Sequence, residues 1–146
     1  MTTTVVRCPA CGVRNRLADD AAGRPRCSRC HVDLPWLVEA GGADVERIIG
    51  RSTLPVLVDL WAPWCGPCRA VAPALERLAA DAAGTIRVVK VNVDESPDVS
   101  ARLGVQGIPT MVLFADGREI ARQVGALPGD AIRRWVDGAL AAPRRA

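Results

Sequence analysis

The sequence predicts an α/β domain preceded by a small metal-binding module, and three observations lead to this prediction. An apolar run over residues 56–61 reads as a buried strand that leads into a Cys-x-x-Cys pair. Strand and helix patterns alternate along the rest of the chain. Two further Cys-x-x-Cys pairs lie within the first 33 residues. We therefore expect a cysteine module over residues 1–33, an α/β domain over residues 34–142 and a disordered tail over residues 143–146.

The length and composition fit one ordinary domain with a small appendage. The chain has 146 residues, 49% of them hydrophobic, and 19 basic against 16 acidic residues give a net charge of only +3. This balance gives no dominant character of a polyanion-binding protein. No apolar run approaches the length of a membrane span, and the N-terminal residues lack the order of a secretory signal. We expect a cytoplasmic protein without a membrane partner.

The cysteine module has the spacing of a zinc ribbon. Its pairs are Cys8-x-x-Cys11 and Cys27-x-x-Cys30, with fifteen residues between them. Four thiolates around a tetrahedral ion leave no position for a substrate, so the predicted zinc is structural. So short a segment buries little core, and the ion would supply its folding energy. The alternative is two disulfides, which a reducing compartment disfavours.

The polar residues of the cysteine module have two interpretations. His31, the only histidine, follows the second cysteine pair where such motifs often have glycine, as Gly12 follows the first. It is either an alternative ligand or a surface residue beside a complete set of cysteines, and we favour the surface residue. An arginine-rich ribbon could also contact nucleic acid, but no aromatic residues are interleaved to stack on bases, so a solvated face is favoured. The arginines are Arg7, Arg14, Arg16, Arg24, Arg26 and Arg29.

Hydrophobic periodicity predicts the elements of the α/β domain in order. Strands are predicted over residues 34–39, 56–61, 85–93, 109–115 and 118–124. Helices are predicted over residues 43–50, 65–80, 96–103 and 130–140. Asp116-Gly117 is a two-residue hairpin turn, so the last two strands should be antiparallel.

The Cys65-x-x-Cys68 pair stands at the junction between the apolar strand and the next helix. Free backbone N–H groups and the positive end of the helix favour a thiolate at Cys65, which should therefore be the attacking sulfur. Cys68, one turn further on, is placed to resolve a mixed disulfide. Gly66 adds no bulk beside the sulfur, and Pro67 suits a first helical turn. The alternatives, half of a zinc site or two small buried residues, do not explain the flanking sequence.

The segment Trp61-Ala-Pro-Trp-Cys-Gly-Pro-Cys68 resembles the active-site segment of the thioredoxin family. The element order over residues 34–142 matches the thioredoxin fold, a mixed sheet with helices on both faces. With its cysteine module, the chain is similar to the zinc-containing second type of bacterial thioredoxin. This resemblance implies reduction of disulfides in protein substrates, no bound organic cofactor, and recycling by an NADPH-dependent thioredoxin reductase. A monomer is the expected state.

Asp59 is a carboxylate in the middle of the apolar strand. If charged, it would cost several kcal/mol, so it should keep its proton to unusually high pH. The strand leads into the helix that carries Cys68, and Asp59 could accept the proton of that thiol, directly or through a water. The matching aspartate of thioredoxins is assigned this role. The alternative is an acid at the sheet edge or one paired with Lys90 on the neighbouring strand.

The Gly-Ile-Pro-Thr segment at residues 107–110 also matches the family motif. The resemblance implies that Pro109 is cis, packs against the cysteine pair and helps to keep metal off the thiols, while Ile108 offers a backbone edge to an extended substrate. A proline that merely starts a strand is the alternative. An apolar rim around Cys65 should suit partly unfolded proteins, and it comprises Trp64, Gly66, Pro67, Ile108, Gly125 and Ala126. Trp36, Trp61 and Trp135 read as packing residues.

The sequence therefore predicts a protein-disulfide reductase. Two other functions stay open. One is an oxidant or isomerase, against which stands the Gly-Pro dipeptide between the cysteines, where those relatives favour histidine. The other is a zinc-ribbon adaptor or redox-sensitive holdase with a secondary thioredoxin domain.

Overall fold

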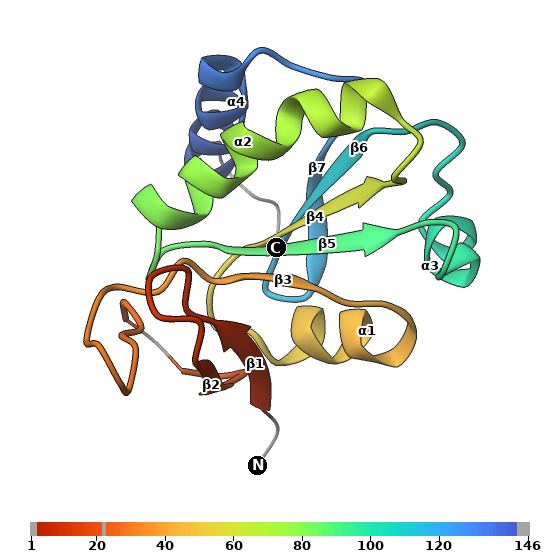
Figure 1. Ribbon diagram of the computed structural model, residues 1–146. Coiled ribbons are helices and arrows are strands. Elements are labelled where there is room, and N and C mark those ends of the chain that lie inside the picture. Colours follow the sequence, from red (N-terminus) through yellow and green to blue (C-terminus); the bar gives the residue numbers. More distant parts are fainter. Residues whose placement is uncertain (1–2, 22, 143–146) are drawn as a thin grey trace.

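A computed structural model describes residues 3–21 and 23–142 as two sheets and four helices (Figure 1). The small sheet pairs β1 (Thr3–Arg7) and β2 (Arg14–Ala18) as antiparallel strands. The large sheet has the order β3-β5-β4-β6-β7. Its strands are β3 (Leu37–Glu39), β4 (Val56–Trp61), β5 (Arg87–Asn92), β6 (Thr110–Ala115) and β7 (Arg118–Val124). The predicted tail over residues 143–146 lies outside the described residues.

Helices cover both faces of the large sheet, as predicted. α2 (Gly66–Asp81) and α4 (Gly129–Ala141) pack on one face, and α1 (Gly42–Arg51) and α3 (Pro97–Arg102) on the other (Figure 1). β4 is parallel to β5, and β5 to β3, whereas β6 is antiparallel to both β4 and β7. The α/β class and the mixed sheet are therefore confirmed.

The bounds of the predicted elements agree with the structure to within two residues, with one exception. The strand predicted over residues 34–39 begins only at Leu37. The Leu34 N–H donates to the carbonyl of Pro25 in the cysteine module, and Leu34 packs with Cys8 and Cys27. Leu34 therefore bonds to the cysteine module and does not pair within the large sheet. The prediction also missed β1 and β2, although Thr4 and Val6 alternate with exposed residues in β1.

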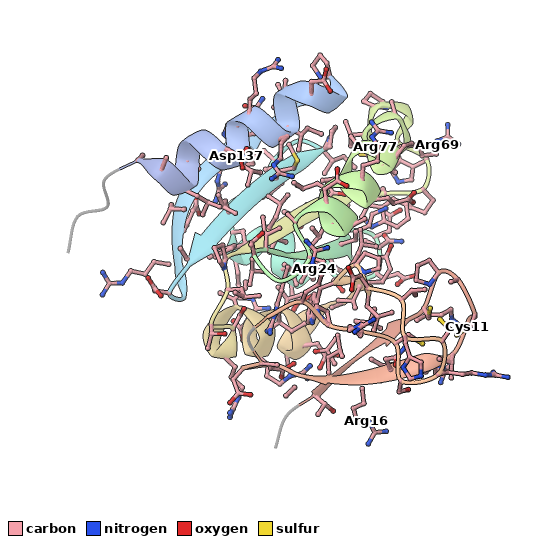
Figure 2. All side chains as sticks on the ribbon, turned by 90° about the vertical axis from the view of Figure 1, so that its left-hand side faces the viewer. Cys11, Arg16, Arg24, Arg69, Arg77 and Asp137 are labelled. Carbon is pink, nitrogen blue, oxygen red and sulfur yellow. A yellow bond between two sulfur atoms is a disulfide. The ribbon has the colours of Figure 1, made fainter. Side chains whose placement is uncertain are left out.

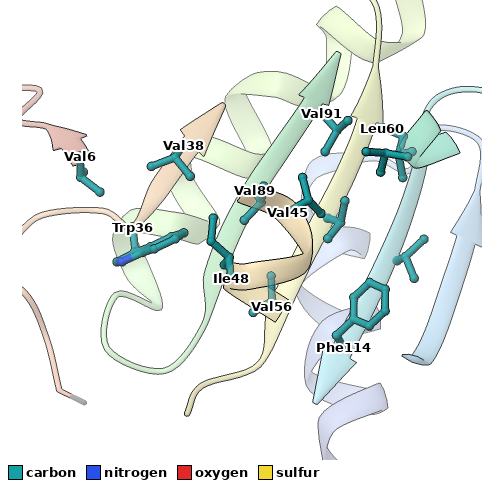
Figure 3. Packing of buried hydrophobic residues seen from close by; sticks show 13 residues of the cluster. Val6, Trp36, Val38, Val45, Ile48, Val56, Leu60, Val89, Val91 and Phe114 are labelled. Atoms are coloured by element: carbon teal, nitrogen blue, oxygen red, sulfur yellow. The ribbon is translucent and has the colours of Figure 1, made fainter. Parts of the chain in front are cut away.

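β4 lies at the centre of the sheet and is buried on both faces. Val56, Val58 and Leu60 point to the α1 side and join the cluster seen in Figure 3. Leu57 points to the opposite side and packs with the residues of α2 and α4. Side chains alternate along a strand, so Asp59 shares the α2 face with Leu57. The sequence thereby places a carboxylate under the helix that carries Cys68.

The cysteine module packs against the end of the large sheet where β4 and β5 begin (Figure 1). Arg87, the first residue of β5, is only 2% exposed. Its guanidinium donates to the carbonyls of Asp19 and Ala21 and lies over the Trp36 ring, 5.0 Å from its centroid. Trp36 is buried, as predicted. A buried cation thus joins the module to the sheet.

Asp19 forms a second connection between the cysteine module and the α/β domain. Its carboxylate is 1% exposed, accepts the Thr4 hydroxyl at 2.6 Å and pairs with Arg47 Nε of α1 at 2.8 Å. A buried charge needs such partners to offset its lost hydration.

Among the described residues, no helix is long and apolar enough to cross a membrane.

Arg47→Met should lower the free energy of unfolding by about 1–3 kcal/mol, because it removes the guanidinium that pairs with the buried Asp19 carboxylate. Urea unfolding of the oxidised protein measures this change. Arg51→Met, in the exposed last turn of α1, is the matched control and should have a much smaller effect. Equal effects of the two substitutions would contradict a role of the Asp19–Arg47 pair in docking.

Candidate redox site and metal centre

The Cys65–Cys68 pair is disulfide-bonded at the junction of β4 and α2, with its Cα atoms 5.3 Å apart. Cys65 is the N-cap residue of α2, and its Sγ accepts the Cys68 N–H at 3.2 Å. A thiolate at Cys65 would meet the same donor and the positive end of a sixteen-residue helix. Both cysteines are buried, with 4% and 2% exposed. The local chain geometry therefore favours charge on Cys65.

The Ile108–Pro109 bond is cis, as the resemblance implied. The Gly125 N–H donates to the Pro109 carbonyl at 2.8 Å, which holds the start of β6 beside the end of β7. Ile108 packs against the cluster of Ala62, Cys65 and Cys68. The structure thus brings Ile108, which is remote in sequence, to the disulfide, and holds Gly125 beside Pro109.

A shallow groove runs beside the disulfide. Two members of the predicted rim, Trp64 and Ile108, line it, and the sequence did not indicate the others, Val93, Ser100, Val105 and Gln106. These residues come from segments around α3. Val93 could have been predicted from the sequence, because the carboxyl ends of the parallel strands β4 and β5 meet at one edge of the sheet. Trp64 is 68% exposed, and its Nε1 donates to Asp94 at 2.8 Å.

The other predicted rim residues do not line this groove. Gly66 and Pro67 are exposed in the first turn of α2. Gly125 is half-buried and Ala126 exposed, just after β7.

Asp59 lies in the central strand and is 1% exposed, so the interpretation as a sheet-edge acid is wrong. Neither carboxylate oxygen has a hydrogen-bond partner in the part of the chain that the structure describes. Lys90 is its in-register neighbour on β5, but the ammonium lies 4.5 Å from the centroid of the Trp61 ring. Burial raises the pKa of Asp59 to about 7, Lys90 opposes this rise, and Glu39 adds to it.

The four predicted metal ligands form one cluster, and none is in a disulfide. Their Sγ atoms lie within 4.8 Å of one another, and the Cys8–Cys30 and Cys11–Cys27 separations are both 3.6 Å. Tetrahedral zinc with bonds of about 2.3 Å would set its sulfurs about 3.8 Å apart, so the donor set fits such an ion. Figure 2 shows the sulfur atoms gathered near Cys11. The alternative of two disulfides is not formed.

Backbone donors favour a thiolate at Cys27 of this cluster. Burial raises the pKa of Cys27, but the N–H groups of Cys30 and Arg29 outweigh it, so the pKa falls to about 5. Gly12 and His31 both adopt positive φ, 79° and 65°, after their cysteine pairs. His31 therefore takes the position of the usual glycine, and the cluster does not include it.

The metal centre and the disulfide lie at opposite ends of the large sheet (Figure 1). The module contacts the far end of the active-site helix, where Arg24 reaches the Ala80 carbonyl at 3.5 Å (Figure 2). Cys65 precedes the first residue of that helix. The two sites therefore share a scaffold but no ligands.

The fold and the buried dithiol at a helix N-terminus define a thiol–disulfide oxidoreductase. A sequence model described as Thioredoxin matches residues 38–138, and the chain belongs to the thioredoxin family. It is 44% identical to the thioredoxin of Haemophilus influenzae over 95 residues, which cover 65% of this chain and 89% of that protein. It is 36% identical to Thioredoxin C-3 of Corynebacterium nephridii over 136 residues, 91% of this chain and 93% of the relative. That match extends into the cysteine module. As a member of this family, the protein is a protein-disulfide reductase.

Asp59→Asn should raise the free energy of unfolding relative to wild type, and the gain should grow as pH rises. Native Asp59 binds its proton up to about pH 7, whereas an unfolded aspartate loses it near about pH 4. The proton on Asp59 therefore contributes fully to the wild-type free energy of unfolding at low pH. As pH rises from about 4 to about 7, this contribution is lost, and the free energy of unfolding falls by up to about 4 kcal/mol. Denaturant unfolding of the oxidised protein at pH 4 to 8 measures it, and Asp116→Asn in the exposed hairpin turn is the control. A constant difference across this range would contradict the burial of an uncompensated carboxylate.

Proposed function

We propose that Cys65 attacks the disulfide of a protein substrate and that Cys68 resolves the mixed disulfide. In the first step the Cys65 thiolate bonds to one substrate sulfur and the other leaves as a thiolate. Cys68 then attacks Cys65 Sγ, so the second substrate thiolate leaves and the Cys65–Cys68 disulfide forms. Two electrons pass from the dithiol to the substrate. The observation that carries this order of attack is the Cys68 N–H donated to Cys65 at the helix N-terminus.

Asp59 accepts the Cys68 proton through a water before the second step. Its position on the α2 face of β4 and its burial support this role. A pKa of about 7 suits a group that must take up and release a proton near neutral pH. A bridging water would also satisfy carboxylate oxygens that lack partners in the described structure.

The substrate is an extended segment of a partly unfolded protein. It would add along the backbone edge at Ile108 and lie over the rim formed by Trp64, Gly66, Pro67, Gly125 and Ala126. The groove between Trp64 and Ile108 would receive one of its side chains. Pro109 is buried and follows Ile108, which packs against the cysteine pair, and it would keep metal ions off the thiols.

An NADPH-dependent thioredoxin reductase would return the disulfide to the dithiol, as the family implies. The protein would act as a monomer in the cytoplasm, where a reducing environment keeps the four module cysteines available for metal. We divide the chain into the module at residues 1–33 and the thioredoxin domain at residues 34–142. In the module, Cys8, Cys11, Cys27 and Cys30 would hold one zinc ion that stabilises the fold without taking part in the reaction.

Reduction of insulin tests the proposed order of attack. Cys65→Ser should abolish turnover, whereas Cys68→Ser should accumulate a covalent complex with the substrate, because attack proceeds and resolution does not. Mass spectrometry of the quenched reaction distinguishes these matched variants. The pair should have a reduction potential near about −270 mV, and a value near about −180 to −120 mV would indicate an oxidant or isomerase instead.

Zinc removal should unfold the cysteine module and leave the redox site active. Metal analysis should give one zinc per chain, and hydrogen exchange after chelation should show lost protection in β1 and β2 but retained protection in β4. Insulin reduction should change by less than about threefold, since the two sites lie at opposite ends of the sheet. Cys11→Ser should reproduce the effect of the chelator. Loss of turnover with the metal would contradict a structural role confined to the module.

A further inference from the structure

Three charged residues form a row across the parallel part of the large sheet. Glu39 on β3 is the in-register neighbour of Lys90 on β5, and Lys90 is the in-register neighbour of Asp59 on β4. In-register residues on neighbouring strands point to the same face. One lysine therefore stands between two carboxylates on the face covered by α2.

Lys90 forms no salt bridge with either carboxylate in the described structure, and its ammonium lies over the Trp61 ring instead. Trp61 lies two residues beyond Asp59 on β4 and so shares its face. The Lys90 ammonium is 4.5 Å from the centroid of its ring, within range of a cation–π contact. The Trp61 Nε1 in turn donates to Glu39 Oε2 at 3.3 Å. Glu39 thus holds the ring on which the ammonium rests.

We propose that Glu39 is a positioning residue for proton transfer by Asp59. It holds Lys90 on the Trp61 ring and keeps the ammonium out of direct contact with the Asp59 carboxylate. This inference rests on the proposed function, in which Asp59 takes the Cys68 proton. It adds a residue that does not touch the reacting sulfurs.

The sign of the effect follows from the charges that face Asp59. These are Lys90 from β5 and Glu39 from β3, and α2 on the same face adds the Cys68 thiol once the disulfide is reduced; Glu39 itself is faced by Lys90 and Glu95. A closer ammonium would stabilise the Asp59 carboxylate and make it a weaker proton acceptor near pH 7. The Glu39 charge, two strand spacings or about 10 Å away, opposes ionisation of Asp59. Both influences of Glu39 keep Asp59 protonated to higher pH.

NMR titration of the Asp59 carboxyl carbon in the reduced protein tests the proposal. Glu39→Gln keeps an acceptor for Trp61 but removes the charge, and should lower the Asp59 midpoint by about 0.3–0.6 pH unit. Glu39→Leu also removes the acceptor and should lower it further. Glu76→Gln, an equal charge change on the exposed face of α2, is the matched control and should leave the midpoint in place.

A double-mutant cycle identifies the route through Lys90. Lys90→Met should raise the Asp59 midpoint, and in that background the shift caused by Glu39→Leu should shrink at least twofold. The pH profile of mixed-disulfide resolution should move with the midpoint in each variant. A merely structural role of Glu39 would change stability without moving either quantity.

The outcomes separate this proposal from the proposed function. An Asp59 midpoint that stays in place in both Glu39 variants overturns the role of Glu39, even if wild type reduces insulin and Asp59→Asn slows resolution. If Asp59→Asn resolves the mixed disulfide at the wild-type rate, the role of Asp59 as acceptor is overturned, whatever the Glu39 variants show.

Discussion

The burial of the Asp59 carboxylate in the central strand is the constraint on which the redox site depends. Charging an acid in such a place costs several kcal/mol, and proteins commonly meet this cost with a direct cation. Here Lys90 is one strand away but rests on Trp61. The cost therefore appears as a raised Asp59 pKa of about 7, which suits the proposed role of Asp59 as a proton acceptor. The raised pKa of Asp59 lowers the free energy of unfolding at neutral pH, and it leaves a titrating group on the face of the sheet that α2 covers.

At the opposite end of the sheet, the buried charges have direct hydrogen-bond and ion-pair partners. Asp19 is paired with Arg47 and bonded to Thr4, and Arg87 donates to two carbonyls over the Trp36 ring. These partners offset part of the cost of burying the charges and fix the geometry of the side chains that carry them. The cost of burying charge is thus met by partners where the cysteine module joins the sheet, and it appears as a raised pKa at Asp59, the proposed proton acceptor.

Local signals made most of the fold and the site predictable. The apolar run and the Asp116–Gly117 turn gave the bounds of β4 and β7 correctly, and cysteine spacing alone identified the four cysteines that the structure gathers into a cluster able to hold a metal ion. Features that depend on register or tertiary contact were missed: the role of Glu39 needs three strands aligned, and Val105 reaches the groove from the segment after α3. The buried Arg87 contradicts the usual exposure of arginine, so nothing in its own segment signals the module that covers it.

The arginines of the cysteine module are better explained by the metal centre than by a polyanionic partner. Four thiolates around one divalent ion leave two excess negative charges at the surface. Arg7, directly before the first cysteine pair, donates to the Gly12 carbonyl, and Arg29 lies within the second pair, where its N–H reaches Cys27 Sγ. Arg24 and Arg26 are engaged with Asp33. Four of the six arginines thus have contacts within the module, and Arg14 and Arg16 remain. Arg16 points away from the body in Figure 2. Two residues do not make a continuous basic face.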